Sequence, residues 1–208
     1  MKPEDTSPPG GDRSRVPLVP LALAFYAVMA AVAVAWRLAA DGEGPFLSDR
    51  GAPAPEGSLL LRDALLGLLV GGGLVVVSRL WTHYTIMGRL LAEHLAGILG
   101  PLSGTKVVVL ALASGLGEEA FFRGALQPRV GLVIASLLFG LAHLVPRREL
   151  APWAGFAALA GVLLGALFDY TGNLLAPALA HVLINGLNLR WLSRASKLRL
   201  GAGSREPG

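Results

Sequence analysis

The sequence of 208 residues contains no cysteine. This absence excludes disulfide bonds, thiolate ligands for a metal ion and a cysteine nucleophile. Charged residues are also scarce, at 15% of the chain, whereas hydrophobic residues make up 53% of it. The mean hydropathy is +0.59. Because a water-soluble domain carries more charge and less apolar surface than this, we expect a lipid bilayer to surround much of the chain.

The apolar residues gather into long runs. A bilayer core takes roughly 20 apolar residues in one helix, and six runs approach that length, at residues 16–36, 64–78 (with apolar flanks on both sides), 107–117, 130–145, 153–168 and 174–192. The first run exceeds the roughly 7–15 residues of a signal-peptide core, so it predicts a retained anchor. Residues 86–99 alternate apolar with charged residues, which is typical of an amphipathic helix at the membrane surface. The predicted fold class is all-α, a polytopic membrane bundle of about six transmembrane helices plus this interfacial helix.

These patterns divide the chain into five expected parts. They are a disordered cytoplasmic head at 1–15, two transmembrane helices and their loop at 16–82, an amphipathic interfacial segment at 83–106, a catalytic four-helix membrane core at 107–192, and a basic cytoplasmic tail at 193–208. Six spans would place both termini on the same side of the membrane. Most Lys and Arg residues lie in the segments on that side, and because cytoplasmic segments carry the excess of positive charge, this predicts cytoplasmic termini. Attraction to anionic lipid then explains the net charge of +4, without a nucleic-acid partner.

The third apolar run is interrupted by two adjacent carboxylates, Glu118 and Glu119, followed by Arg123. An ionisable group at membrane depth costs at least about 2.5–3.5 kcal/mol on insertion scales, so each is a functional candidate. On a helix, Glu119 and Arg123 stand four residues apart and can form an ion pair. Glu118 points about 100° away from them. The pattern therefore predicts one neutralised carboxylate and one that faces another partner.

Two further runs also carry polar side chains. Phe139 and His143 stand one helical turn apart in the fourth run, and His181 and Asn185 do so in the sixth. Glycine and alanine surround these positions, and small residues let membrane helices approach closely. If the helices meet, a carboxylate with one imidazole can activate a water molecule. The other imidazole and the carboxamide can then donate hydrogen bonds to a developing oxyanion.

Each polar site also has a structural interpretation. The ion pair could hold a helix end, Glu118 could reach the membrane surface, and His181 with Asn185 could join two helices by a hydrogen bond. Phe139 is most simply a packing residue. His83 and His94 lie in a polar stretch and predict solvated side chains, and Asp169 predicts a helix end entering a turn. The occurrence of all three motifs in order favours chemistry.

The ordered motifs, Glu118-Glu119-x-x-x-Arg123, Phe139-x-x-x-His143 and His181-x-x-x-Asn185, resemble the CPBP family of membrane proteases. That family includes the type II CAAX prenyl endopeptidases. The resemblance covers about residues 107–192 and implies that Glu118, assisted by His143, activates a water molecule. It also implies that His181 and Asn185 stabilise the oxyanion. Supporting roles fall to the remaining motif residues, Glu119, Arg123 and Phe139.

The resemblance predicts an intramembrane endopeptidase, placed in the bacterial inner membrane, that cuts a membrane-anchored protein or peptide. We expect no cofactor. Two histidines and a glutamate could instead hold a zinc ion, but the sequence lacks the His-Glu-x-x-His arrangement of many zinc proteases. Other interpretations are a non-catalytic membrane protein that binds a partner or confers immunity to a toxin, and a small transporter or proton relay. The transporter is disfavoured because no inverted repeat is evident.

Overall fold

A computed structural model describes residues 18–47, 57–145, 147 and 150–203. The expected head at 1–15 lies outside the described residues. The elements are α1 (Leu18–Asp41), α2 (Gly57–Tyr84), α3 (Ile86–Leu99), α4 (Gly104–Glu119), the π-helical segment η1 (Ala120–Leu126), α5 (Gln127–Ala142), α6 (Ala151–Thr171) and α7 (Leu175–Gly203). Within the described ranges, the β-pairing is an isolated bridge between Leu47 and Asn173. The predicted all-α helix bundle is confirmed.

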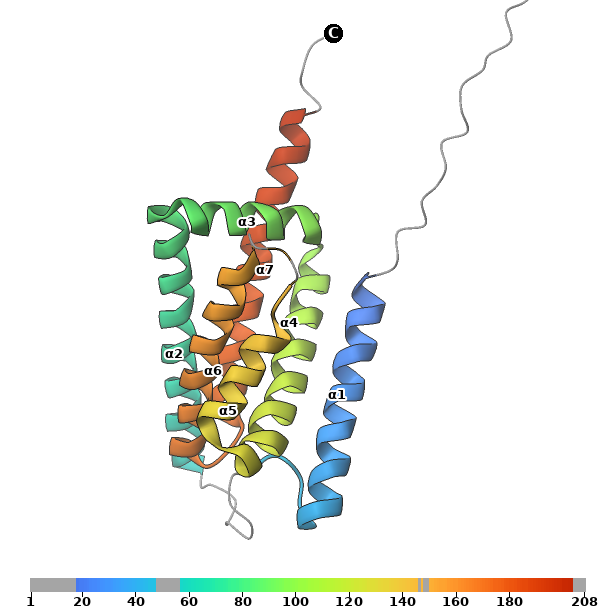
Figure 1. The fold of residues 1–208 in the computed structure, drawn as a ribbon, viewed down its shortest axis with the longest axis vertical. Helices are drawn as coiled ribbons and strands as arrows, with labels where there is room; N and C mark the ends of the chain where they lie inside the picture. The colour runs from blue at the N-terminus through green and yellow to red at the C-terminus, as the bar shows by residue number, and fades with distance from the viewer. Residues whose placement is uncertain (1–17, 48–56, 146, 148–149, 204–208) are drawn as a thin grey trace, which may run out of the picture.

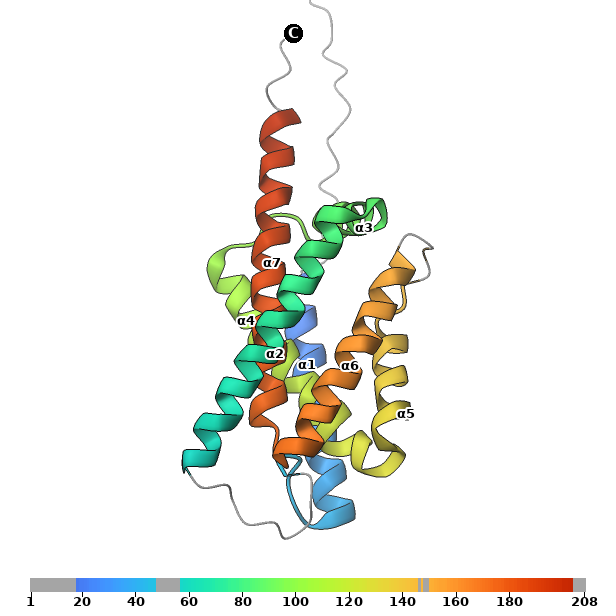
Figure 2. The ribbon, with the colours of Figure 1, turned by 90° about the vertical axis from the view of Figure 1, so that its left-hand side faces the viewer.

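The long helices stand side by side, and α3 lies across one end of them (Figure 1). Helix α7 packs against α2 and α4, α5 packs against α6, and α1 packs against α4 and η1 (Figure 2). The first turn of α1 and the last turn of α7 point toward the end of the bundle where α3 lies (Figure 1). This arrangement agrees with an even number of passes, and the cytoplasmic orientation of that end stays a prediction.

Helix α3 has the bounds that the sequence predicts, Ile86–Leu99. It begins after Thr85, whose side chain accepts a hydrogen bond from the backbone N–H of Gly88 and so caps the helix. Leu91 and Ala96 are buried against the bundle, whereas His94 is exposed together with the apolar Ile86 and Met87. The helix therefore covers one end of the long helices with part of its apolar surface and leaves the rest exposed.

Within the residues that the structure describes, four helical stretches are long and apolar enough to cross a membrane, fewer than the six spans expected. They are Val19–Asp41, Leu59–Tyr84, Gly104–Ala142 and Ala151–Thr171. The third and fourth expected spans lie together in the stretch Gly104–Ala142, and the sixth corresponds to α7, which is not among the four. Helix α7 carries His181, Asn185 and Asn188, which lower its hydropathy but line an interior cavity.

The carboxylate pair lies inside a helical run, which corrects the expectation that the third span ends near residue 117. The chain continues as a helix from α4 through η1 into the start of α5. The reversal comes later, at Gly131, whose φ of +81° is a conformation that glycine adopts without strain. Helices α4 and α5 then run in opposite directions (Figure 1). Glu118 and Glu119 are thus held in the bundle interior, not at its surface.

The beginning of the expected tail is also helical, because α7 continues to Gly203. Residues 193–200 are rich in Leu, Arg, Lys and Ala, which favour a helix, and contain neither glycine nor proline. The Ser193 hydroxyl accepts a hydrogen bond of 2.7 Å from the backbone N–H of Leu102. This contact ties the last helix to the segment that joins α3 and α4. Residues 204–208 lie outside the described part.

Candidate active site

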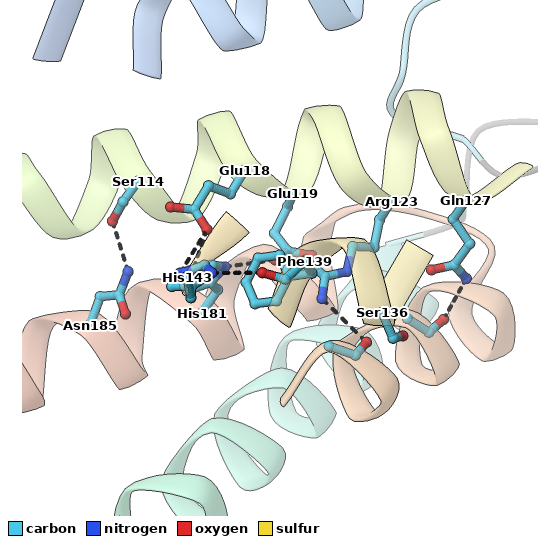
Figure 3. A network of polar contacts seen from close by, with 12 residues as sticks. Ser114, Glu118, Glu119, Arg123, Gln127, Ser136, Phe139, His143, His181 and Asn185 are labelled. Atoms are coloured by element: carbon cyan, nitrogen blue, oxygen red, sulfur yellow. Dashed lines mark hydrogen bonds and ion pairs between the residues drawn. The ribbon is translucent and has the colours of Figure 1, made fainter. Parts of the chain in front are cut away.

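The structure brings Glu118 and both motif histidines together from three helices (Figure 3). The Oε2 atom of Glu118, on α4, lies 3.7 Å from Nε2 of His143, at the end of α5. The same oxygen lies 3.9 Å from Nε2 of His181, on α7. Glu118 and His181 are buried, with 6% and 4% of their surfaces exposed. These distances are too long for direct hydrogen bonds and short enough for a shared water molecule.

Contacts at the far side of the His143 ring define its hydrogen bonding. Nδ1 of His143 lies 2.8 Å from the backbone carbonyl oxygen of Phe139. Because a carbonyl oxygen only accepts hydrogen bonds, Nδ1 carries a proton and Nε2 is the ring nitrogen that faces Glu118. The Phe139 ring lies 4.6 Å from the His143 ring and 5.7 Å from the His181 ring, between centroids. Phe139 therefore packs against both imidazoles.

Glu119 connects the ion pair to the second histidine. Its Oε1 atom accepts a hydrogen bond of 2.8 Å from Arg123 and one of 2.6 Å from Nδ1 of His181. The ion pair that the spacing predicts is present, and the contact with His181 adds a partner from another helix. An ionised carboxylate only accepts, so Nδ1 of His181 is the donor and Nε2 faces Glu118. Glu119 thereby orients His181.

The two carboxylates differ in what their unpartnered oxygens face. Within the described residues, the buried Oε2 atoms of Glu118 and Glu119 both lack a hydrogen-bond partner, and that of Glu118 is the one that faces the Nε2 atoms of both histidines. A buried polar atom without a partner costs about 1–3 kcal/mol. Such an atom, directed at two imidazole nitrogens, is the polar group of this cluster that is available to a substrate or a water molecule.

Asn185 lies one turn beyond His181 on α7 and contacts Ser114 rather than Glu118. Its side-chain amide donates a hydrogen bond of 2.8 Å to the Ser114 hydroxyl. Ser114 in turn donates one of 2.8 Å to the backbone carbonyl of Leu110. The carboxamide group has a second N–H that can serve another acceptor. Sequence reasoning missed Ser114, whose one signal is its position four residues before Glu118.

The π-helical segment η1 follows the carboxylate pair directly. In a π-helix the backbone bonds skip one residue more than in an α-helix, and such segments occur frequently at functional sites. Here Arg123 and Gln127 both reach across to α6, where their side chains donate to the backbone carbonyls of Gly161 and Gly165 at 3.2 and 3.0 Å. These bonds anchor the helix just after Glu119 to a neighbouring helix.

Glycines on α4 allow the neighbouring helices to approach the site. A Cβ atom added at Gly115 would stand 2.5 Å from a methyl group of Val182 on α7, and one at Gly117 would stand 2.9 Å from the carbonyl oxygen of Tyr26 on α1. Any larger side chain at these positions would push α7 or α1 away. The small residues therefore serve the close approach that the sequence predicts.

A cavity of about 540 Å³ contains the cluster. Its polar lining includes Tyr26, Ser114, Glu118, His143, His181, Asn185 and Asn188. Most of the other lining residues are apolar and come from α1, α2, α3, α6 and α7. Tyr26 was not singled out from the sequence, yet it lines the same cavity as Glu118 and packs against Gly117, the residue before Glu118. The cavity offers an apolar chamber with polar groups gathered at one place.

The remaining polar candidates have structural surroundings. His83 and His94 are exposed. Asp169 accepts a hydrogen bond of 2.7 Å from Gln127, and α6 ends two residues later, just before Gly172, which has the left-handed conformation. Among the residues that the structure describes, no three His, Cys, Asp or Glu side chains are grouped in a way that could hold one metal ion.

Comparisons with known proteins agree with the motifs. Residues 101–187 match the family model of the Rce1-like type II CAAX prenyl endopeptidases. This range includes all seven motif residues, and the predicted resemblance is confirmed over it. The uncharacterized protein YpbD of Bacillus subtilis (strain 168) is 37% identical over 83 residues, which cover 39% of this chain and 42% of YpbD. The alignment thus spans less than half of that relative. No solved structure matches the chain.

Proposed function

We propose that the chain is an intramembrane endopeptidase. The premise is that residues 101–187 match the Rce1-like family and lie in a chain with membrane-spanning helices. The proposed enzyme hydrolyses a peptide bond of a membrane-associated protein or peptide. The observation that supports this most is the approach of Glu118 Oε2 to the Nε2 atoms of His143 and His181, at 3.7 and 3.9 Å, inside one cavity.

Glu118 and His143 activate the attacking water molecule. The unpartnered Oε2 atom of Glu118 accepts one O–H of the water, and the lone pair on Nε2 of His143 accepts the other. The water oxygen then attacks the scissile carbonyl carbon while Glu118 takes up the proton. When the tetrahedral intermediate collapses, Glu118 returns this proton to the leaving amine and the carbon–nitrogen bond breaks.

His181 and Asn185 stabilise the oxyanion. His181 holds a proton on Nδ1 through Glu119, so it donates from Nε2 when the ring is an imidazolium. Two carboxylates, Arg123 and an imidazolium then sum to zero charge within the buried cluster, which limits the cost of burying them. The second N–H of Asn185 supplies another donor. Removing one oxyanion donor typically lowers kcat by about 10²–10³-fold.

The proposed mechanism uses no metal ion, and the sequence lacks the His-Glu-x-x-His arrangement of many zinc proteases. Metal analysis of the purified protein tests the choice. We expect less than stoichiometric zinc, and full peptidase activity after treatment with a strong chelator followed by its removal. Stoichiometric zinc with loss of activity on chelation, restored by added zinc, would establish the zinc enzyme instead.

Comparison of the protein termini in host membranes tests the proposed activity and identifies the substrate in the same experiment. Cells would produce the wild type, Glu118→Gln or the control Glu93→Gln, which alters an exposed carboxylate on α3. We expect new termini, in membrane proteins, with the wild type and Glu93→Gln only. If no terminus depends on Glu118 although deletion of the protein has a phenotype that Glu118→Gln rescues, the function is non-catalytic binding or immunity.

We also propose that the chain lies in the bacterial cytoplasmic membrane with both termini in the cytoplasm. The first turn of α1 and the last turn of α7 point toward the same end of the bundle, which supports this topology (Figure 1). Reporter fusions at either terminus, active only in the cytoplasm or only in the periplasm, test it.

A further inference from the structure

Tyr26 lies outside the segment that matches the protease family, yet it reaches Glu118. Its backbone lies against α4 at the residue before Glu118, because a Cβ atom on Gly117 would stand 2.9 Å from the Tyr26 carbonyl oxygen and 3.3 Å from its Cβ atom. This close approach fixes α1 beside the carboxylate. The Tyr26 side chain is partly buried and lines the cavity that contains Glu118 and both histidines.

Tyr26 and Glu118 face the same cavity from neighbouring helices, which places a phenol beside a carboxylate. A phenol donates to a carboxylate, which only accepts when ionised. The Oε2 atom of Glu118, which faces the histidines, has no hydrogen-bond partner in the described part of the chain. A phenol that donates to the Oε1 side would leave Oε2 directed at His143 and His181.

We propose that Tyr26 is a positioning residue for the hydrolysis, and that α1 thereby supplies part of the active site. Its hydroxyl restrains rotation of the Glu118 carboxylate and donates to the ionised form that acts as the base. A phenol does this without adding a charge to the buried cluster. The inference rests on the proposed function, since it assigns a role in that same reaction.

Loss of the hydroxyl should affect the protonation of Glu118 as well as its position. The other charged or titratable groups near Glu118 are its neighbour Glu119, His143 from α5, His181 from α7 and Arg123 from η1. All four remain in a variant that lacks the hydroxyl. Because the ionised form of Glu118 alone loses a hydrogen-bond donor, a larger fraction of the carboxyl groups should then be protonated at mildly acidic pH.

The test compares Tyr26→Phe with Tyr84→Phe in the full chain, using a cleavage product found by the analysis of termini. Tyr84 is 75% exposed at the end of α2 and is a matched control. For Tyr26→Phe we expect kcat to fall by about tenfold or more, the loss of one hydrogen bond to a charged group, with KM within about twofold. The acidic limb of the pH–rate profile should move to higher pH. Tyr84→Phe should match the wild type.

Two results would overturn the inference. One is a Tyr26→Phe variant with the kcat and pH profile of the control. The other is a variant that loses thermal stability and yield while the remaining active enzyme keeps the wild-type pH profile, which indicates packing alone. A second measurement compares Tyr26→Gln, whose amide can donate a hydrogen bond, with Tyr26→Leu, which cannot. The kcat of Tyr26→Gln should be the higher of the two, and equal kcat values would contradict the inference. A wild type that cleaves nothing contradicts the proposed function instead.

Discussion

Two buried carboxylates in this bundle have different partners. At the end of α1, the Oδ2 atom of Asp41 lies 2.6 Å from a guanidinium nitrogen of Arg37 and 2.8 Å from one of Arg129. In the middle of the bundle, the Oε2 atom of Glu118 lies 3.7 and 3.9 Å from two imidazole nitrogens. The Asp41 side chain is 1% exposed and that of Glu118 is 8% exposed. Burial is therefore similar, and the quality of pairing differs.

This difference separates a structural carboxylate from a chemical one. Asp41 pairs with two cations, Arg37 on its own helix and Arg129 on α5. The pair with Arg129 joins α1 to α5, and the Arg129 guanidinium also lies 4.9 Å from the centroid of the Trp36 ring. A pair of this kind needs no substrate to complete it. Glu118 has one oxygen without a partner in the described residues, and folding alone gives no reason to bury a carboxylate in that state. The reaction with a bound water molecule that we propose would supply one.

Replacing Glu118 by Gln should give the largest effect of the variants considered. The amide keeps the shape of the side chain but cannot accept a proton, so peptidase activity should fall by about 10²–10⁴-fold, the contribution of a general base. The melting temperature in detergent should not decrease, because a buried, incompletely paired carboxylate is costly to fold. Activity measurements and thermal unfolding check both parts. Retained activity, or a large loss of stability, would place Glu118 with Asp41 as a structural group.

Replacing Asp41 by Asn should have the opposite pattern. Removing the charge leaves Arg37, which is 2% exposed, without the carboxylate that it contacts at 2.6 Å. Breaking a buried pair in this way costs about 3–5 kcal/mol. We expect a marked decrease in thermal stability, with kcat per folded molecule close to that of the wild type. A variant that folds as well as the wild type but loses activity would show that the contacts of Asp41 with Arg37 and Arg129 have a role beyond stability.

The sequence predicts the local half of the site well. Pairs one helical turn apart, such as Glu119 with Arg123 and His181 with Asn185, follow from the period of the α-helix, whatever the fold. Contacts between helices do not follow from any period. The bonds of Glu119 to His181, 62 positions apart, and of Asn185 to Ser114, 71 apart, depend on how the helices pack.

The same limit explains where the fold differs from expectation. Hydropathy treats a charge as the end of a span, so it predicts that the carboxylate pair closes the third run. In the bundle, Arg123 and His181 both bind the Oε1 atom of Glu119 from within, and the helix continues to Gly131. Polar residues facing the cavity likewise reduce the apolar character of α7. Buried polar groups with partners are thus the feature that a hydropathy profile misjudges.

Replacing Ser114 by Ala is the smallest and most discriminating change. It removes the hydroxyl that accepts the 2.8 Å hydrogen bond from Asn185 and leaves Glu118 and Glu119 with their own contacts. A neutral hydrogen bond contributes about 0.5–1.5 kcal/mol, so stability should fall by no more than this and kcat by about two- to tenfold. The variant Thr105→Val, which removes an exposed hydroxyl in the first turn of α4, is the control. Because Asn185 would act only on the oxyanion, KM should stay unchanged. The double variant Glu118→Gln/Ser114→Ala is compared with Glu118→Gln, and Ser114→Ala with the wild type. If kcat falls by the same factor in both comparisons, the carboxamide acts independently of the base. No further loss in the double variant would show that both belong to one catalytic unit.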